Sequence, residues 1–210
     1  MKKRHGQIIS IIGLLFLGVF CVSAQQSRTA TELRIEMDGI YGPLFVTVDG
    51  EEQKITEQAQ QAWIISGGAD VVYSSSDGSG GYENEGQGLH IYNVRTGERK
   101  RIMSHYYMIE DVKEVVTSKK KRALLVRMAD GGLGASYVAV VDPRRGEVFF
   151  RRWARVLERK GDTITIGFYR EQDWEKLDGD QGEKVRPYKI ERRNLNSLLL
   201  RPVIHNKRDQ

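Results

Sequence analysis

The sequence predicts an all-β fold made of repeated groups of four antiparallel strands, and two observations support that prediction. Short segments rich in β-branched and aromatic residues alternate with turns that contain glycine or charged residues, which is typical of strands and hairpins. The turns also recur at a nearly constant interval along the 210 residues of the chain. With 40% hydrophobic residues, a chain of this length can bury the core of one or two domains.

The first 24 residues have the pattern of a secretory signal peptide. Basic residues from Lys2 to Arg4 precede an apolar run from Ile8 to Phe20, and small residues end at Ala24. The run is too short to span about 30 Å of hydrocarbon. We therefore expect cleavage near Ala24 and a periplasmic or secreted protein with no stable membrane span, with a retained anchor as the alternative.

Removal of this segment changes what the net charge implies. The whole chain has 33 Lys and Arg against 28 Asp and Glu, a net +5. Residues 1–24 hold three of the basic residues and no acid, which leaves 30 against 28, or +2. A charge this small does not indicate a nucleic acid as partner. The one cysteine, Cys21, also lies in the segment, so the remaining chain has no disulfide.

The rest of the chain divides into a polar lead at 25–31, a single repeat domain at 32–204 and a tail at 205–210. Segment 56–62, with its Gln and Ala residues, is the best candidate for a helix, as a connector. Strands are expected where β-branched and aromatic residues are most frequent. In chain order these segments are 33–36, 44–48, 63–65, 71–73, 89–94, 115–117, 123–126, 137–141, 154–157, 163–166 and 202–204.

Four tight turns mark the repeat. Three of them have a central glycine, at Gly50, Gly97 and Gly146, and Asn194 takes that place in the fourth, so that the intervals are 47, 49 and 48 residues. Gly and Asn both tolerate the positive φ of hairpin turns. Four strands per unit at this period is typical of the blades of a β-propeller.

We expect about four blades, the first of them completed by strands from both ends of the chain. Four units of about 48 residues come close to the length of the chain that remains after residue 24, and four blades are the lower limit for this architecture. The alternatives are an open propeller arc, which a second copy of the chain could complete, and a β-sandwich or barrel.

Two segments resemble the WD40-like (PD40) repeat of TolB-type β-propellers. Residues 63–74 read WIISGGADVVYS, where the family has a Trp-Ser-Pro-Asp-Gly turn before a strand. Residues 88–98 read GLHIYNVRTGE, an Ile-Tyr strand that runs into a Thr-Gly turn. The resemblance covers about residues 57–200, and the later repeats depart from it, with TSKK at 117–120 in place of the turn. It implies blades and an exported bacterial protein that contacts other envelope proteins, or a propeller that gates a peptidase; it carries no catalytic residue.

The turns and loops also differ in charge. The turns between the first and second and between the third and fourth strands of each blade should lie on one face, and they are basic: Arg95, Lys119, Lys120, Lys121, Arg122, Arg144, Arg145, Arg159, Lys160, Arg192 and Arg193. The loops between the second and third strands should lie on the opposite face, and they are acidic. Charged turns are also what any solvated surface carries.

We expect the acidic loops to recognise a partner, because functional residues concentrate on loops held by a rigid sheet. The favoured contact residue is Trp174, an aromatic side chain within a polar loop at 171–184. The full set of candidate contact residues is Asp77, Tyr82, Glu83, Glu85, Asp130, Trp174, Asp178 and Asp180.

The main functional hypothesis is a non-catalytic exported binding module for an envelope or secreted protein, without a cofactor and with self-association left open. One alternative is an enzyme that hydrolyses glycans or peptides through loop carboxylates. Another is a structural module stabilised by calcium in the glycine-rich acidic loops 77–85 and 178–183. The chain has no zinc-spaced His pair and no Gly-x-Ser-x-Gly motif, so no catalytic residue is assigned.

Overall fold

The computed structural model describes residues 28–76, 87–105, 108–129, 135–178 and 185–200. Strands dominate it, which confirms the all-β prediction. The elements in order are β1 (Ala30–Ile35), β2 (Gly42–Val48), β3 (Glu51–Ile65), the 3-10 turn η1 (Ser66–Gly68), β4 (Asp70–Ser76), β5 (Gln87–Asn93), β6 (Arg99–His105), β7 (Met108–Val116), β8 (Arg122–Ala129), β9 (Ser136–Asp142), β10 (Glu147–Trp153), β11 (Arg155–Lys160), β12 (Thr163–Phe168), α1 (Glu171–Asp178), β13 (Lys189–Asn194) and α2 (Leu195–Leu198).

The strands pair in three antiparallel sheets. The strands of the first sheet belong to two packed layers, because its strand β3 takes part in both. Strands β1 to β6 form a six-stranded sheet, β7 to β10 a four-stranded sheet and β11 to β13 a three-stranded sheet. The 15-residue strand β3 pairs with β2 through its first half and with β4 from Ala59 onward. Four layers result: β1, β2 and the first half of β3; the second half of β3 with β4 to β6; β7 to β10; and β11 to β13.

Three clusters of buried side chains join consecutive layers. Successive residues of a strand point to opposite faces of the sheet, so Val71 packs between the first and second layers and Val72 between the second and third. Ile164 packs between the third and fourth layers. Each inner sheet therefore buries both of its faces, as stacked propeller blades do.

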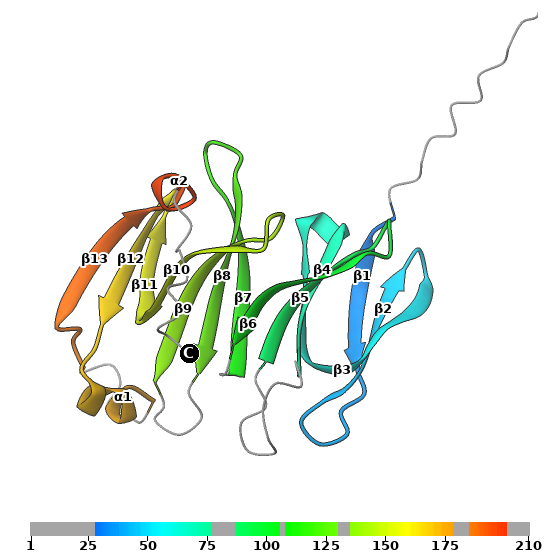
Figure 1. Cartoon of the computed structure of the whole chain (residues 1–210), viewed down its shortest axis with the longest axis horizontal. Coiled ribbons are helices and arrows are strands. Elements are labelled where there is room, and N and C mark those ends of the chain that lie inside the picture. Colours follow the sequence, from blue (N-terminus) through cyan, green and yellow to red (C-terminus); the bar gives the residue numbers. More distant parts are fainter. Residues whose placement is uncertain (1–27, 77–86, 106–107, 130–134, 179–184, 201–210) are drawn as a thin grey trace, which may run out of the picture.

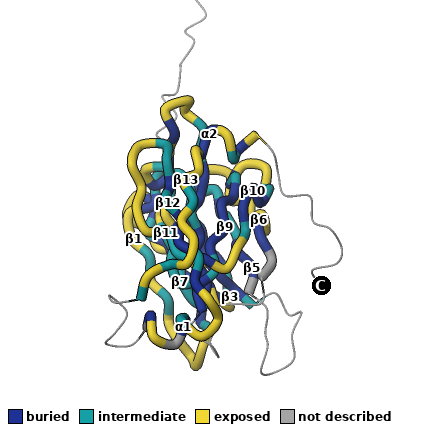
Figure 2. Tube along the Cα trace, turned by 90° about the vertical axis from the view of Figure 1, so that its left-hand side faces the viewer, coloured by how far each residue is buried: buried dark blue, intermediate teal, exposed yellow. Residues whose placement is uncertain are grey.

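The four layers stand in an open row. β1 and β2 lie at one end of the long axis and β13 lies at the other, and in the view turned by 90° the layers overlap one behind another (Figures 1 and 2). The propeller-like stacking agrees with the prediction, and the described residues form the open arc that was its alternative. Each of the two inner layers has four strands and each of the two end layers has three. Segment 202–204, expected to complete the first blade, lies outside the described residues.

Two local predictions are wrong. Segment 56–62 is part of β3 and not a helix, because pairing with β2 and β4 outweighs the helix propensity of its Gln and Ala residues. Residues 171–178 form α1 where a loop was expected. Trp174 and Leu177, three residues apart, place two apolar side chains on one buried helix face, and acids in the first turn suit the helix dipole.

Three of the four turns have the positive φ that was predicted for their central residue. Gly50, Gly97 and Gly146 have φ of +83°, +71° and +70°, a region that side chains with a Cβ rarely adopt. Asn194 has a φ of −85° and caps α2, its side chain accepting a hydrogen bond from the Ser197 N–H at 3.2 Å. The fourth repeat therefore ends in a helix cap where a hairpin turn was expected.

Candidate functional site

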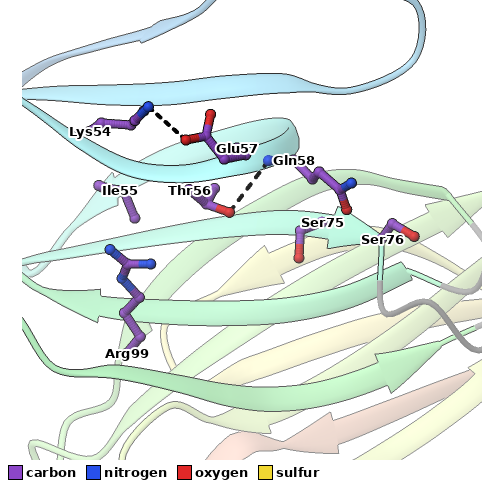
Figure 3. Close-up of a pocket in the computed structure, with 8 residues that line it drawn as sticks. All are labelled: Lys54, Ile55, Thr56, Glu57, Gln58, Ser75, Ser76 and Arg99. Atoms are coloured by element: carbon purple, nitrogen blue, oxygen red, sulfur yellow. Dashed lines mark hydrogen bonds and ion pairs between the residues drawn. The ribbon is translucent and has the colours of Figure 1, made fainter.

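A polar pocket lies where β3 passes from the first layer to the second (Figure 3). Its volume is about 380 Å³, within the usual range for ligand pockets. Three strands line it: β3 through Lys54, Ile55, Thr56, Glu57 and Gln58, β4 through Ser75 and Ser76, and β6 through Arg99.

The pocket lies along an edge of β3. Alternate residues of a regular strand point to opposite faces, so five consecutive lining residues indicate that the strand presents its edge or bulges there. The β2–β3 register does shift twice in this region, between Gly42 and Leu44 and between Leu44 and Phe45. Among the described residues no strand pairs with β3 before Ala59 on the side away from β2. Bulges of this kind are common beside binding sites.

The pocket wall combines both charges with neutral hydrogen-bonding groups. Lys54 Nζ lies 2.6 Å from Glu57 Oε1, an exposed ion pair that adds little stability. The Gln58 N–H donates to Thr56 Oγ1 at 3.4 Å, which keeps this hydroxyl beside the bulge. Ile55 is buried, so the wall also has an apolar part.

Arg99 brings an exposed cation to the pocket. Within the described residues no acid forms an ion pair with its guanidinium, which presents five N–H donors in a planar fork. Burial raises the pKa of Tyr73 on β4, two strands away in the same sheet, and the positive charge of Arg99 partly opposes that rise. The Arg99 side chain could therefore bind a carboxylate or a backbone carbonyl that enters the pocket.

A second feature ties the layers together at the edge where the hairpin turns lie. The Ser66 N–H donates to Glu114 Oε2 at 2.7 Å, across the second and third layers. The Ser118 N–H likewise donates to Asp162 Oδ1 at 2.8 Å, across the third and fourth. Hydrogen bonds from the Ser118 hydroxyl and N–H hold the pKa of Asp162 below its ordinary value of 3.8. Each serine thus bonds a carboxylate of the following repeat.

Sequence reasoning missed both the pocket and these ties. The serines lie 52 residues apart, at equivalent turns of successive repeats, so the repeat alignment contained a signal for the ties. The pocket had no such signal, because it depends on the bend of a strand that was expected to be a helix.

The favoured contact residue, Trp174, is not presented to a partner. Its side chain is 4% exposed and packs on Tyr169, with the ring centroids 5.2 Å apart. The guanidinium carbon of Arg155 lies over the Trp174 ring, 5.9 Å from its centroid. The ring holds α1 against the end of the fourth layer.

The described side chains that line the pocket include none of the other candidate contact residues. Asp178 is the last residue of α1, and only its backbone is described. The described ranges exclude the remaining candidates, which are Asp77, Tyr82, Glu83, Glu85, Asp130 and Asp180. The two loops expected to bind calcium also lie largely or wholly outside those ranges, and no group of three His, Cys, Asp or Glu within them could hold a metal. The helices that the structure describes include none long and apolar enough to cross a membrane.

Comparison with known proteins gives two structural likenesses. No family model and no curated protein sequence matches the chain. The β-propeller domain of the Trilobed protease from Pyrococcus furiosus, which has an open velcro topology, matches 66% of this chain and 48% of its own, at 11% identity and a TM-score of 0.43. Pyrococcus horikoshii acylaminoacyl peptidase matches 68% of this chain and 28% of its own, at 11% identity and a TM-score of 0.44. The chain therefore spans about half or less of these proteins.

The hypothesis of a non-catalytic binding module for an envelope or secreted protein is contradicted. Both similar chains come from proteins named as a protease or a peptidase. The aromatic residue that was to anchor the partner is buried in the molecule. Helix α1 takes the place of residues 171–178 of the loop in which this aromatic residue was expected.

Proposed function

We propose that this chain acts on peptides, holding an extended peptide by strand addition along the open edge of β3 and so presenting it for hydrolysis. The observation that carries this proposal is the polar pocket at the first half of β3, where no described strand pairs on the side away from β2.

The open edge has the length and chemistry that a peptide strand needs. Residues 51–58 extend over about 27 Å at roughly 3.4 Å per residue. An extended peptide satisfies its own N–H and C=O groups by pairing with such an edge, and pockets beside the edge select its side chains. Lys54, Glu57 and Arg99 can select charged groups on the peptide.

The pocket favours a peptide over a glycan, the other substrate considered for a hydrolase. Among the described residues of its lining there is no aromatic side chain on which a sugar ring could stack. It offers hydroxyl, amide, ammonium, carboxylate and guanidinium groups, which match the donors and acceptors of a peptide.

Binding of a fluorescent pool of nonapeptides, with valine alternating with randomised residues, tests the proposal. We expect measurable binding to the full chain and a loss of roughly tenfold to a hundredfold in the Arg99→Gln variant, because a hydrogen bond to a charged group contributes roughly 1.5–3 kcal/mol. Arg101→Gln is the matched control, since Arg101 lies on the same strand and does not line the pocket. Mass spectrometry of the same mixture shows whether the bound peptides are cleaved.

Peptides methylated on alternate backbone nitrogens separate strand addition from simple side-chain binding. They keep the side chains but lose the N–H groups that would pair with β3, so we expect them not to bind. Equal binding of methylated and unmethylated peptides would contradict strand addition. Equal losses of affinity in the Arg99 and Arg101 variants would show that the pocket does not bind the peptide.

A further inference from the structure

The hairpin turns of successive layers lie along one edge of the molecule. The β7–β8 turn, α2 and the start of β1 lie at this edge, and α1 lies at the opposite edge (Figure 1). Direct contacts join the turns: Lys100 Nζ, at the start of β6, donates to the backbone oxygens of Arg144 and Arg145 at 3.0 and 3.1 Å. We call this edge, with the turns at 49–50, 94–98, 117–121, 143–146 and 161–162, the turn face.

Several acids in or beside the turn face bond other groups of the molecule. Asp70 and Glu114 are 13% and 21% exposed, and both lie within ion-pair distance of Arg122. Asp142 accepts hydrogen bonds from the N–H groups of its own turn. Asp162 accepts from Ser118 and Asn196. These carboxylates stabilise turns and layer contacts, and all four are half-buried.

The basic side chains of the same turns point outward. Arg95, Lys119, Lys120 and Arg144 are exposed, and no described acid forms an ion pair with any of them. Exposed acids are fewer here: Asp49, which is paired with Arg28, and Glu51 and Glu98. The turn face therefore presents excess positive charge although the chain after residue 24 is nearly neutral.

We infer that the turn face binds the surface of an anionic lipid bilayer. Clustered Lys and Arg side chains are attracted to anionic headgroups, each contributing while it lies within a Debye length of the surface. The described chain also begins on this face: Arg28 contacts Asp49 of the β2–β3 turn. If the apolar run at 8–20 is retained, as in the alternative to cleavage near Ala24, it is joined to the molecule at the face that carries the positive charge.

Vesicle partitioning of the full chain tests this inference. The measured quantity is the partition coefficient on vesicles of 30% phosphatidylglycerol in phosphatidylcholine, divided by that on pure phosphatidylcholine. The triple variant Arg95→Gln, Lys119→Gln, Arg144→Gln should lower this ratio by about tenfold or more. Salt at 0.5 M should lower it as well. All proteins compared carry the same residues 1–27, so differences in the ratio between them report the turn face.

A second triple variant with the same change in net charge shows whether the effect depends on the turn face or only on the net charge of the chain. The variant Arg170→Gln, Lys176→Gln, Arg186→Gln removes three exposed basic residues before, within and after α1, at the opposite edge. It should keep the ratio of the natural chain. A ratio near one for the natural chain, an equal loss in both triple variants, or tighter binding to duplex DNA than to the anionic vesicles would each overturn the inference.

Discussion

Single polar residues connect the layers of this molecule where one repeat meets the next. Asp162 is the most densely bonded of them: it receives the N–H and hydroxyl of Ser118 and the amide of Asn196, and the backbone oxygen of the same residue accepts from the Leu195 N–H at 2.8 Å. These donors favour the charged carboxylate, which lowers its pKa. The ionisation of this one side chain therefore strengthens the hydrogen bonds between the third and fourth layers, beside the apolar cluster that joins them.

Replacement of Asp162 by Asn should make the melting temperature less sensitive to acid. A folded-state pKa below the unfolded value means that the charged carboxylate stabilises the fold above the unfolded value of 3.8. That stability is lost as the pH falls through the folded pKa. Asp162→Asn should thus melt below the natural chain at pH 7, and the difference should shrink between pH 4 and pH 2, as measured by circular dichroism.

Glu98→Gln provides the control, because Glu98 is an exposed acid in a turn. Its melting temperature should follow that of the natural chain at every pH. A constant difference between Asp162→Asn and the natural chain from pH 7 to pH 2 would contradict the role given to ionisation.

Among the elements, the strands could be predicted from sequence and the segments that depend on tertiary contacts could not. Strands such as β5 and β9 combine β-branched residues with glycine or charged turns, and both signals are local. The segment at 56–62 has helix-favouring residues, and only its neighbours β2 and β4 make it a strand. The candidate pocket forms at that same bend, so the error in the element also concealed the site.

Helix α1 gives a prediction at this scale. Trp174 is 4% exposed in a cluster with Ala135, Tyr169 and Leu177. Trp174→Ala should lower the free energy of unfolding by about 3 kcal/mol, since a buried Trp leaves a large cavity. Urea unfolding measures the change, with Tyr188→Ala as control, because Tyr188 is 59% exposed and its loss should cost less than about 0.5 kcal/mol. An unchanged unfolding midpoint for Trp174→Ala would show that its ring is not part of the core.

The molecule as a whole is an open stack of four layers whose two end sheets each leave one face without a described neighbour. The end faces differ in chemistry. The first carries the Arg34 guanidinium over Phe45 and bonded to Glu36 and Glu52, and the last exposes Leu157, Tyr188 and Ile190. The repeat length predicted the number of layers, because each repeat contributes the three or four strands of one layer. Whether the layers close into a ring depends on the angle between one layer and the next. The spacing of the turns in the sequence does not determine that angle.

Spin labels on the two end layers test the open row. Thr47 lies on β2 and Thr165 on β12, on the faces opposite to those that carry the buried Val46 and Ile166. With Cys21 replaced by Ser, labels at Thr47→Cys and Thr165→Cys should give a distance well above the roughly 10 Å between packed sheets. Double electron–electron resonance measures the distance between the two labels. A distance as short as that between neighbouring sheets would indicate a closed ring.

Hydrogen–deuterium exchange of the full chain with the nonapeptide pool tests the central claim most directly, because strand addition protects backbone amides. We expect slower exchange at residues 51–58 of β3 when peptide is bound, and unchanged exchange in β11 and β12 at the far end of the stack. Bound peptide that leaves the exchange of residues 51–58 unchanged, or that protects another sheet instead, would contradict a peptide site at the open edge of β3.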